Sequence, residues 1–341
     1  MRILVTGHKG YIGSALVPAL VAAGHEVEGL DVDFFASAGA ADLVNVPEIR
    51  KDIRDVGVAD LEGFSAVIHL AALSNDPIGD LDPELTYEIN YHSSVRLASL
   101  AKAAGVERFI FSSSCSNYGA ATGRMMTEDS TLNPVTVYGR SKVLTEGAVQ
   151  SLASESFSPV FLRNATAYGV SRRMRTDLVV NNMVAWVFTT GRIRILSDGT
   201  PWRPLVHVRD IAAAFVAVIR APRQVIHNQV LNIGRTEENY QVRQVADIVA
   251  GVLPAASIEY AGTAGPDSRD YRVSFDKVAR LLPAFVPRWN VRLAVEELLD
   301  FYARVKLTVD DIQGPRFARI ARIKQLLESG ALDSELRWKA H

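Results

Sequence analysis

The chain has 341 residues, of which 48% are hydrophobic, and its formal net charge is −1 at pH 7. This length supports a large core in one or two domains, because single cores stop growing at roughly 250 to 300 residues. Basic and acidic residues are mixed along the chain and nearly balance, so the protein has no strong positive field that would attract nucleic acid or an anionic membrane. The most apolar later run, residues 211–219, is too short to cross a bilayer. We therefore expect a globular protein with neither nucleic acid nor membrane as a partner.

The number of cysteines and the N-terminal sequence indicate the cellular compartment of the protein. Cys115 is the only cysteine, which excludes an internal disulfide framework and a multi-cysteine metal site. No metal ion is expected. The first residues reach Gly7 without the architecture of a signal peptide. Together these features predict a cytoplasmic protein.

The first 165 residues alternate short β-rich runs with longer helical patterns, which is typical of a parallel sheet covered by helices. Buried strands are expected at residues 2–7, 26–31, 66–72, 108–114 and 158–164. Helices are expected between them at residues 11–23, 83–104 and 138–154. The pattern predicts a Rossmann-type, doubly wound α/β sheet.

In the second half of the chain, strand and helix patterns alternate less regularly. A helix is expected at residues 177–190, a strand and a helix at 205–220, and an amphipathic helix that packs on the surface at 316–330. We expect a smaller α/β substrate domain that is interleaved with the first. The NAD-binding domain would comprise residues 1–168 and about 205–234, and the substrate domain about 169–204 and 235–341.

The stretch "TGHKGYIG" places Gly7, Gly10 and Gly13 between the first strand and the first helix. Glycines at this junction permit a tight turn, let the backbone approach a pyrophosphate, and bring the helix close to the sheet. The helix N-terminus favours the anion. We therefore expect this turn, with Tyr11 and Ile12, to bind a dinucleotide.

Asp31 ends the second expected strand about 20 residues after the glycines. A carboxylate at this position accepts hydrogen bonds from the adenosine ribose hydroxyls. The following residues 32–34 include no arginine to receive a 2′-phosphate, so the sequence favours NAD over NADP. Asp52 and Ile53 are weaker candidates for contact with the adenine.

Tyr138 and Lys142 lie four residues apart in "YGRSK", so they share one face of the expected helix. A phenol has a usual pKa of roughly 10, and a nearby ammonium stabilises its phenolate and lowers that pKa. Tyr138 could then accept the proton of a substrate hydroxyl. Ser114 ends a parallel strand on the edge where such folds bind ligands.

The sequence resembles the extended short-chain dehydrogenase/reductase family, in its branch of nucleotide-sugar epimerases and dehydratases. The resemblance covers about residues 1–280 and rests on the ordered motifs "TGHKGYIG", "GLD", "KDIRD", "VIHLAA", "FSSSCSNYG", "YGRSK", "FLRNATAYG", "RPLVHVRD" and "YRVSFDK". It implies that Tyr138 is the base, that Lys142 holds the nicotinamide ribose, and that Ser114 bonds the reacting sugar hydroxyl. It also implies an NAD cofactor. Further cofactor contacts would come from Leu70, Ala71, Ala72, Asn90 and Ser112.

The resemblance also implies a nucleotide-diphosphate sugar as substrate and a homodimer built from helices 83–104 and 138–154. Arg203 and Arg269 match arginines that bind the diphosphate of the nucleotide sugar in this family. Arg172, Arg173 and Arg175 could also face phosphates, although a charged loop is more often exposed. The remaining candidate substrate contacts are Ser74, Asn75, Ser116, Thr166 and Asn182.

Residues 115 and 116 bear on the reaction. The 4,6-dehydratases of the family carry an Asp-Glu pair where this chain has Cys115-Ser116, which disfavours that reaction. Cys115 is interpreted mainly as a packing residue, because buried thiols are usually inert. The resemblance favours 4-epimerisation, in which NAD⁺ transiently oxidises C4 of the sugar and hydride returns to the opposite face. Dehydration, ketoreduction and decarboxylation remain alternatives, and so does a non-catalytic NAD-sensing scaffold.

Overall fold

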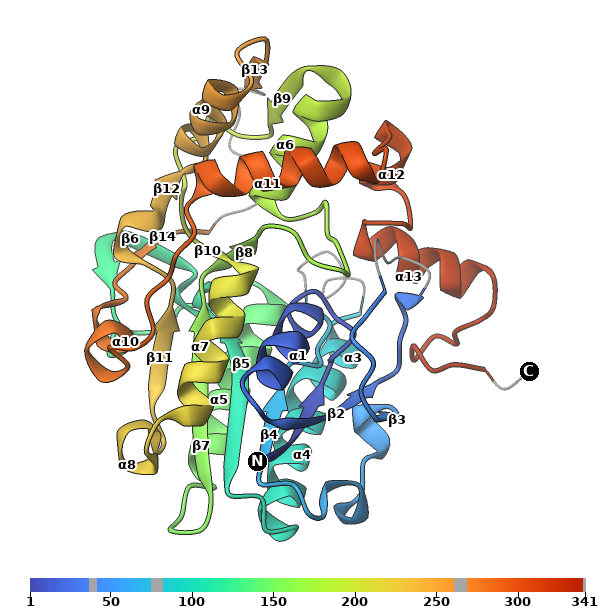
Figure 1. The fold of residues 1–341 in the computed structure, drawn as a ribbon, viewed down its shortest axis with the longest axis vertical. Helices are drawn as coiled ribbons and strands as arrows, with labels where there is room; N and C mark the ends of the chain where they lie inside the picture. Colours follow the sequence, from blue (N-terminus) through green and yellow to red (C-terminus); the bar gives the residue numbers. More distant parts are fainter. Residues whose placement is uncertain (37–41, 75–81, 261–268, 340–341) are drawn as a thin grey trace.

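The computed structural model describes residues 1–36, 42–74, 82–260 and 269–339. Its centre is a seven-stranded parallel sheet in the order β11-β7-β5-β4-β1-β2-β3 (Figure 1). The strands of this sheet are Arg2–Thr6 (β1), Glu26–Asp31 (β2), Glu48–Arg50 (β3), Ala66–His69 (β4), Arg108–Ser114 (β5), Ser158–Asn164 (β7) and Val230–Ile233 (β11).

The strand order reverses between β1 and β4. The chain runs outward from β1 through β2 to β3, then crosses to the other side of β1 and continues through β4, β5 and β7 to β11. At such a reversal the connections after two adjacent strands leave in opposite directions, and a crevice opens at the carboxyl edge of the sheet. The residues that follow β1 and β4 therefore border a ligand site.

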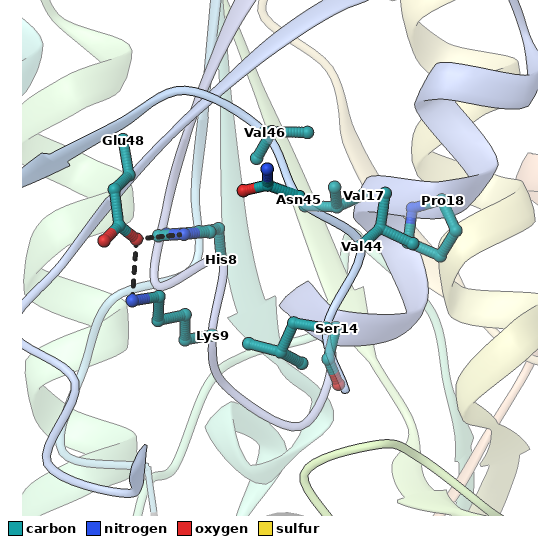
Figure 2. Close-up of a pocket in the computed structure, with 10 residues that line it drawn as sticks. His8, Lys9, Ser14, Val17, Pro18, Val44, Asn45, Val46 and Glu48 are labelled. Atoms are coloured by element: carbon teal, nitrogen blue, oxygen red, sulfur yellow. Dashed lines mark ion pairs between the residues drawn. The ribbon is translucent and has the colours of Figure 1, made fainter. Parts of the chain in front are cut away.

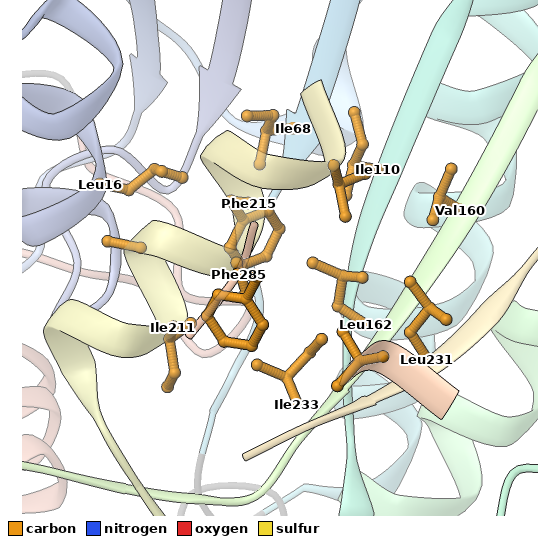
Figure 3. Packing of buried hydrophobic residues seen from close by; sticks show 14 of the residues in the cluster. Leu16, Ile68, Ile110, Val160, Leu162, Ile211, Phe215, Leu231, Ile233 and Phe285 are labelled. Atoms are coloured by element: carbon orange, nitrogen blue, oxygen red, sulfur yellow. The ribbon is translucent and has the colours of Figure 1, made fainter. Parts of the chain in front are cut away.

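Both faces of the sheet are buried, because successive side chains of a strand point to opposite faces. Ile3 and Val5 of β1 pack on one side, while Leu4 packs on the other, and all three are fully buried. On the first side, Leu16 and Phe215 of the covering helices join this core (Figure 3). The helices on this side are Gly13–Ala22 (α1), Val208–Arg220 (α7), Arg223–Ile226 (α8) and Asp276–Leu281 (α10).

The helical segment 83–104 covers the second face together with α5. It contains one π-helical turn, Glu88–His92 (η4), between two α-helical parts. Leu97 and Val149 bury their side chains against this face. The helices on this side are Pro83–Tyr87 (α3), Ser93–Ala103 (α4), Val137–Gln150 (α5) and Arg319–Glu328 (α13).

A second layer of structure lies beyond the carboxyl edge of the large sheet (Figure 1). Its small sheets are β12-β10-β8, β13-β9 and β14-β6, and its own core includes Tyr168, Val184 and Leu298. Its strands are Ala120–Met126 (β6), Thr166–Tyr168 (β8), Arg192–Ile195 (β9), Trp202–His207 (β10), Asn239–Gln241 (β12), Ser257–Tyr260 (β13) and Asp270–Val273 (β14). Its α-helices are Val179–Thr190 (α6), Val242–Val252 (α9), Val291–Arg304 (α11) and Val309–Gln313 (α12). Short 3₁₀ turns occur at Ile53–Asp55 (η2), Val58–Leu61 (η3), Cys115–Tyr118 (η5) and Thr236–Glu238 (η6).

The doubly wound parallel sheet and its five expected strands are confirmed. Two edge strands, β3 and β11, have no counterpart in the sequence interpretation, since they span only three and four residues and carry too little pattern to stand out. The amphipathic helix expected at residues 316–330 is confirmed as α13, which buries Ile323 and Leu326 in the core on one side of the large sheet. Within the described part of the chain, no helix has the length and apolarity needed to span a membrane.

Candidate active site

A cavity of about 1120 Å³ lies at the carboxyl edge of the central sheet. Residues from four neighbouring strand ends line it: Gly7 after β1, Asp31 in β2, Leu70 after β4 and Ser114 in β5. Side chains from β8, α6, β9 and β10 form the facing wall. Doubly wound sheets bind ligands at this edge, so the cavity is the candidate active site.

Most of the site residues predicted from the sequence line this cavity. They are Gly7, Gly10, Tyr11, Ile12, Gly13, Asp31, Asp52, Ile53, Leu70, Ala71, Ala72, Ser74, Ser112, Ser114, Ser116, Tyr138, Thr166, Asn182, Arg203 and Arg269. Asn90 and Lys142 do not line it. The buried side-chain amide of Asn90 instead pairs with both the amide and the carbonyl of Leu73, at 2.8 and 3.0 Å. Asn90 therefore shapes the cavity through the backbone of Leu73.

The turn after β1 has the bare backbone that a diphosphate requires. Gly7 lies in the left-handed region at φ +72°, and a Cβ there would come within 2.7 Å of the Ala71 nitrogen. A Cβ on Gly13 would overlap the carbonyl oxygen of Gly7. The turn is closed by a 2.9 Å hydrogen bond from the Gly10 amide to the Gly7 carbonyl and leads into α1, whose N-terminus favours an anion. The residues present thus fit the diphosphate of NAD.

Asp31 lies at the end of β2 with its carboxylate held in place by backbone. Its two oxygens accept hydrogen bonds from the amides of Lys9 and Asp33 at 2.9 and 2.8 Å. Burial raises the pKa of Asp31, and these hydrogen bonds oppose the rise. The Lys9 ammonium is bound by Asp33 at 3.0 Å. This end of the cavity therefore fits ribose hydroxyls better than a 2′-phosphate.

A second pocket, of about 210 Å³, lies behind the glycine turn (Figure 2). Glu48 contacts both His8 and Lys9 there, at 3.3 and 2.7 Å. The hydrogen bond from Lys9 is the main cause that lowers the pKa of Glu48. Glu48 thereby ties β3 to the turn that follows β1, which stabilises the glycine turn from outside the main cavity.

The 3₁₀ turn η2 borders the same end of the main cavity. Asp52 lines the cavity, but its carboxylate already accepts hydrogen bonds from the backbone and the side chain of Arg54. Although burial alone would raise it, these bonds lower the pKa of Asp52. Ile53 is buried and offers an apolar surface of the kind that an adenine ring requires.

The other end of the cavity holds Ser114 and Tyr138. Lys142 lies one helical turn beyond Tyr138 on α5, with its Nζ 5.6 Å from the centroid of the Tyr138 ring. The same Nζ donates a 2.8 Å hydrogen bond to the Ser112 carbonyl. Burial lowers the pKa of Lys142 to about 7. The ammonium is thus positioned beside the phenol, as the four-residue spacing predicts.

The burial of Lys142 predicts a pH dependence of stability. Its pKa is about 7 in the folded protein and 10.5 ordinarily, so between these values the unfolded chain binds more protons. The free energy of unfolding should therefore rise with pH over this window, relative to Lys142→Met, by up to about 1.4 kcal/mol per pH unit. Urea unfolding of both cofactor-free proteins at several pH values measures this difference. If the free energies of unfolding of the two proteins changed with pH in parallel, the lowered pKa of Lys142 would be contradicted.

The hydroxyl of Ser116 supports Ser114, whereas Cys115 points away from the cavity. Ser114 Oγ accepts hydrogen bonds from the amide and the hydroxyl of Ser116 at 3.1 and 2.9 Å. Cys115 is fully buried, and its Sγ donates to the Arg163 carbonyl. Burial raises the pKa of this thiol well above its usual value. Cys115 is therefore a core residue, in agreement with the packing interpretation.

The facing wall carries several of the residues expected to contact substrate. Thr166 comes from β8, Asn182 from α6 and Arg203 from β10. The Arg203 guanidinium donates to the carbonyl of Arg269, so these two predicted residues lie together. Asn75 lies outside the described residues.

Two arginines in the second half of the chain are buried, although a charged loop is usually exposed. Arg172 is exposed, but Arg173 and Arg175 are buried, so the expectation of an exposed loop is wrong for them. Arg175 lines the cavity, where Asp177 binds its guanidinium through two hydrogen bonds of 2.9 and 2.8 Å. The cluster of arginines in "SRRMRTD" was the only sequence signal for this feature.

The C-terminal helix contributes a part of the cavity wall that the sequence interpretation missed. Arg319, Ile320 and Ile323 of α13 line the cavity. The amphipathic pattern of residues 316–330 indicated a buried face but not what that face would cover.

The comparisons with known proteins agree with this geometry. The family model described as "NAD dependent epimerase/dehydratase family" matches residues 3–234. The UDP-glucose 4-epimerase of Corynebacterium glutamicum is 29% identical over 322 residues, which cover 88% of this chain and 95% of that protein.

Two solved structures share the fold over most of the chain. TunA, an NAD dependent NDP-hexosamine 5,6-dehydratase of tunicamycin biosynthesis, has a TM-score of 0.79 and 26% identity, covering 89% of this chain and 98% of its own. MoeE5, solved with UDP-glucuronic acid and NAD, has a TM-score of 0.78 and 27% identity, covering 89% and 99%. Since the family model spans more than half of its length, this chain belongs to the NAD dependent epimerase/dehydratase family.

Proposed function

We propose that this protein is an NAD-dependent nucleotide-sugar 4-epimerase. The observation that carries the proposal is one continuous cavity that runs from the glycine turn and Asp31 to Ser114 and Tyr138, and on to Arg203. Residues 1–168 with about 205–234 would hold the cofactor, and about 169–204 with 235–341 would hold the nucleotide sugar. The adenosine of NAD would lie at the Asp31 end, and the sugar between Tyr138 and the facing wall.

The side chains at the Tyr138 end can perform the proton transfer that such a reaction requires. Tyr138 accepts the proton of the sugar hydroxyl and later returns it, and Lys142 stabilises the phenolate electrostatically. Ser114 accepts its hydrogen bonds from Ser116, so its own proton is free to bind the reacting sugar oxygen. When bound, NAD would accept a hydride from the sugar carbon and return it.

The carboxylates around the cavity support epimerisation over elimination of water. Among the described residues, the carboxylates that line the cavity are Asp31, Asp33, Asp52 and Asp177. Each already has a backbone amide or a cation as its partner. None of them follows Ser114 in the chain, where a 4,6-dehydratase would carry its acid. Expulsion of water therefore lacks an evident proton donor beside Ser114.

The relatives suggest UDP-sugars as the first substrates to test, because they include UDP-glucose 4-epimerases and MoeE5 bound to UDP-glucuronic acid. Incubation with UDP-, dTDP-, GDP-, CDP- and ADP-sugars should yield, for one of them, a product of unchanged mass with an inverted C4 centre by NMR. A product lighter by one water would instead support a dehydratase, the activity of the related TunA. Loss of carbon dioxide or a net change in NADH would support the decarboxylase or the reductase.

The proposal includes a homodimer in the cytoplasm that serves carbohydrate biosynthesis. Leu144 on the outer face of α5 is 45% exposed, and α5 packs beside α4, so the two helices could present one surface to a second copy. A buried free thiol at Cys115 suits a reducing compartment. Light scattering at micromolar concentration tests the dimer, and a monomeric mass would contradict it.

A further inference from the structure

Residues 319–338, near the end of the described chain, form what we call the C-terminal strap. It comprises α13 and the segment after it, and in Figure 1 it lies beside β2 and β3, at the edge of the large sheet. Ile323, Leu326, Leu332 and Leu336 are at most 5% exposed and belong to the core on that side of the sheet. The strap is therefore packed as an integral part of the domain, although it lies outside the residues 3–234 that the family model matches.

The strap is anchored to the segments that carry the proposed adenosine contacts. The Trp338 indole donates a 2.6 Å hydrogen bond to the Val32 carbonyl, immediately after Asp31. The Trp338 ring also contacts the ring of Phe34, with centroids 5.8 Å apart. Arg337 pairs with Asp55 of η2 at 2.6 Å. Both ends of the adenosine region, after β2 and after β3, are thereby tied to the strap.

Arg319 begins the strap with a buried guanidinium that faces the cavity. It is 5% exposed, it lies 3.8 Å from the centroid of the Phe35 ring, and it donates to the Arg173 carbonyl. Among the described residues, no carboxylate lies within the 4.0 Å of an ion pair with Arg319, whereas Arg173 and Arg175 are paired with Asp33 and Asp177. Burial lowers the pKa of Arg319 to about 9. A desolvated cation without a counter-ion favours an anionic ligand.

We propose that the C-terminal strap is part of the cofactor site: Arg319 binds the diphosphate of the ADP half of NAD, and the strap retains the cofactor between turnovers. This inference rests on the proposed placement of adenosine at the Asp31 end, and it moves residues 319–338 from the proposed substrate domain to the cofactor site. Charge-assisted hydrogen bonds to phosphate are among the strongest that side chains make. The anion in turn compensates the buried guanidinium.

The experiment measures the release of NAD rather than turnover. Isotopically labelled NAD is bound to the purified protein, unlabelled NAD is added in excess, and the retained label is followed by mass spectrometry. Arg319→Met and Trp338→Ala should each release the label about tenfold faster or more. Lys324→Ala, an exposed position on the same helix, should release it at the wild-type rate. Hydrogen exchange should also slow in residues 319–338 when NAD binds.

The outcomes separate this inference from the proposed function. If the wild type retains the label and both strap variants release it at the wild-type rate, the strap has no role in retention and only this inference fails. Unchanged hydrogen exchange in residues 319–338 on addition of NAD would overturn it as well. A wild-type protein that binds no NAD at all would overturn the proposed function and the strap together. Hydrogen exchange of the Arg319→Met variant, measured without NAD, shows whether the strap remains folded in that variant.

Discussion

Replacing Tyr138 by phenylalanine is expected to lower turnover of the nucleotide sugar by roughly 10²–10⁴-fold, which is the usual contribution of a positioned general base. The substitution removes only the phenolic oxygen, so the ring contact with the ammonium of Lys142, at 5.6 Å, can persist. NAD and nucleotide-sugar affinities should therefore change little. The loss should fall on kcat rather than on KM.

Steady-state kinetics and isothermal calorimetry of Tyr138→Phe measure these quantities. Tyr91→Phe is a matched control, because Tyr91 lies in η4 and does not line the cavity. Normal turnover by Tyr138→Phe would show that another group takes the proton. A protein with intact NAD binding and no turnover of any sugar, even as wild type, would instead support the non-catalytic sensor.

Replacing Arg163 by methionine is expected to lower the free energy of unfolding by about 3–5 kcal/mol, the usual cost of breaking a buried ion pair from one side. Arg163 on β7 binds Glu146 on α5 at 2.7 Å, and both side chains are about 5% exposed or less. Burial alone would lower the pKa of Arg163, but its hydrogen bonds to Glu146 raise it overall. Without the guanidinium, the carboxylate would remain buried and uncompensated.

The same ion pair supports the active site. Glu146 also accepts hydrogen bonds from Ser113 and Asn117, at 2.5 and 3.0 Å, and Ser113 precedes Ser114 in the chain. Urea unfolding of Arg163→Met and of the double variant Glu146→Gln/Arg163→Met tests the cause, since the double variant removes both charges and should recover part of the loss. Equal losses in the two proteins would mean that the buried charge of Glu146 is not the source.

Much of the candidate site could be predicted from the sequence, because its elements are local. The glycine turn, the carboxylate of Asp31 at a strand end, and the Tyr138–Lys142 spacing each depend on residues within one turn or one element. Backbone geometry alone places such residues, through the reversal of strand order and the 3.6-residue period of a helix. The structure accordingly brings most of the predicted residues to one cavity.

Other features have partners far apart in the chain. The Arg54 side chain binds the carbonyl of Glu335, 281 residues away, and the Trp338 indole donates a hydrogen bond to the Val32 carbonyl, 306 residues away. No periodicity records such pairings, so the sequence did not predict the contacts of the strap, and it led us to expect that the neighbouring Arg173 and Arg175 would be exposed.

The sequence by itself determined the doubly wound sheet, the dinucleotide turn and the order of the chemical groups along it, since these follow from local pattern and from the handedness of the chain. Only the tertiary structure decided which arginines are buried, that Cys115 faces the core, and that α13 covers the proposed adenosine end. The physical reason is that burial and ion pairing depend on long-range packing, and the packing energy of an apolar face does not specify which surface it will cover.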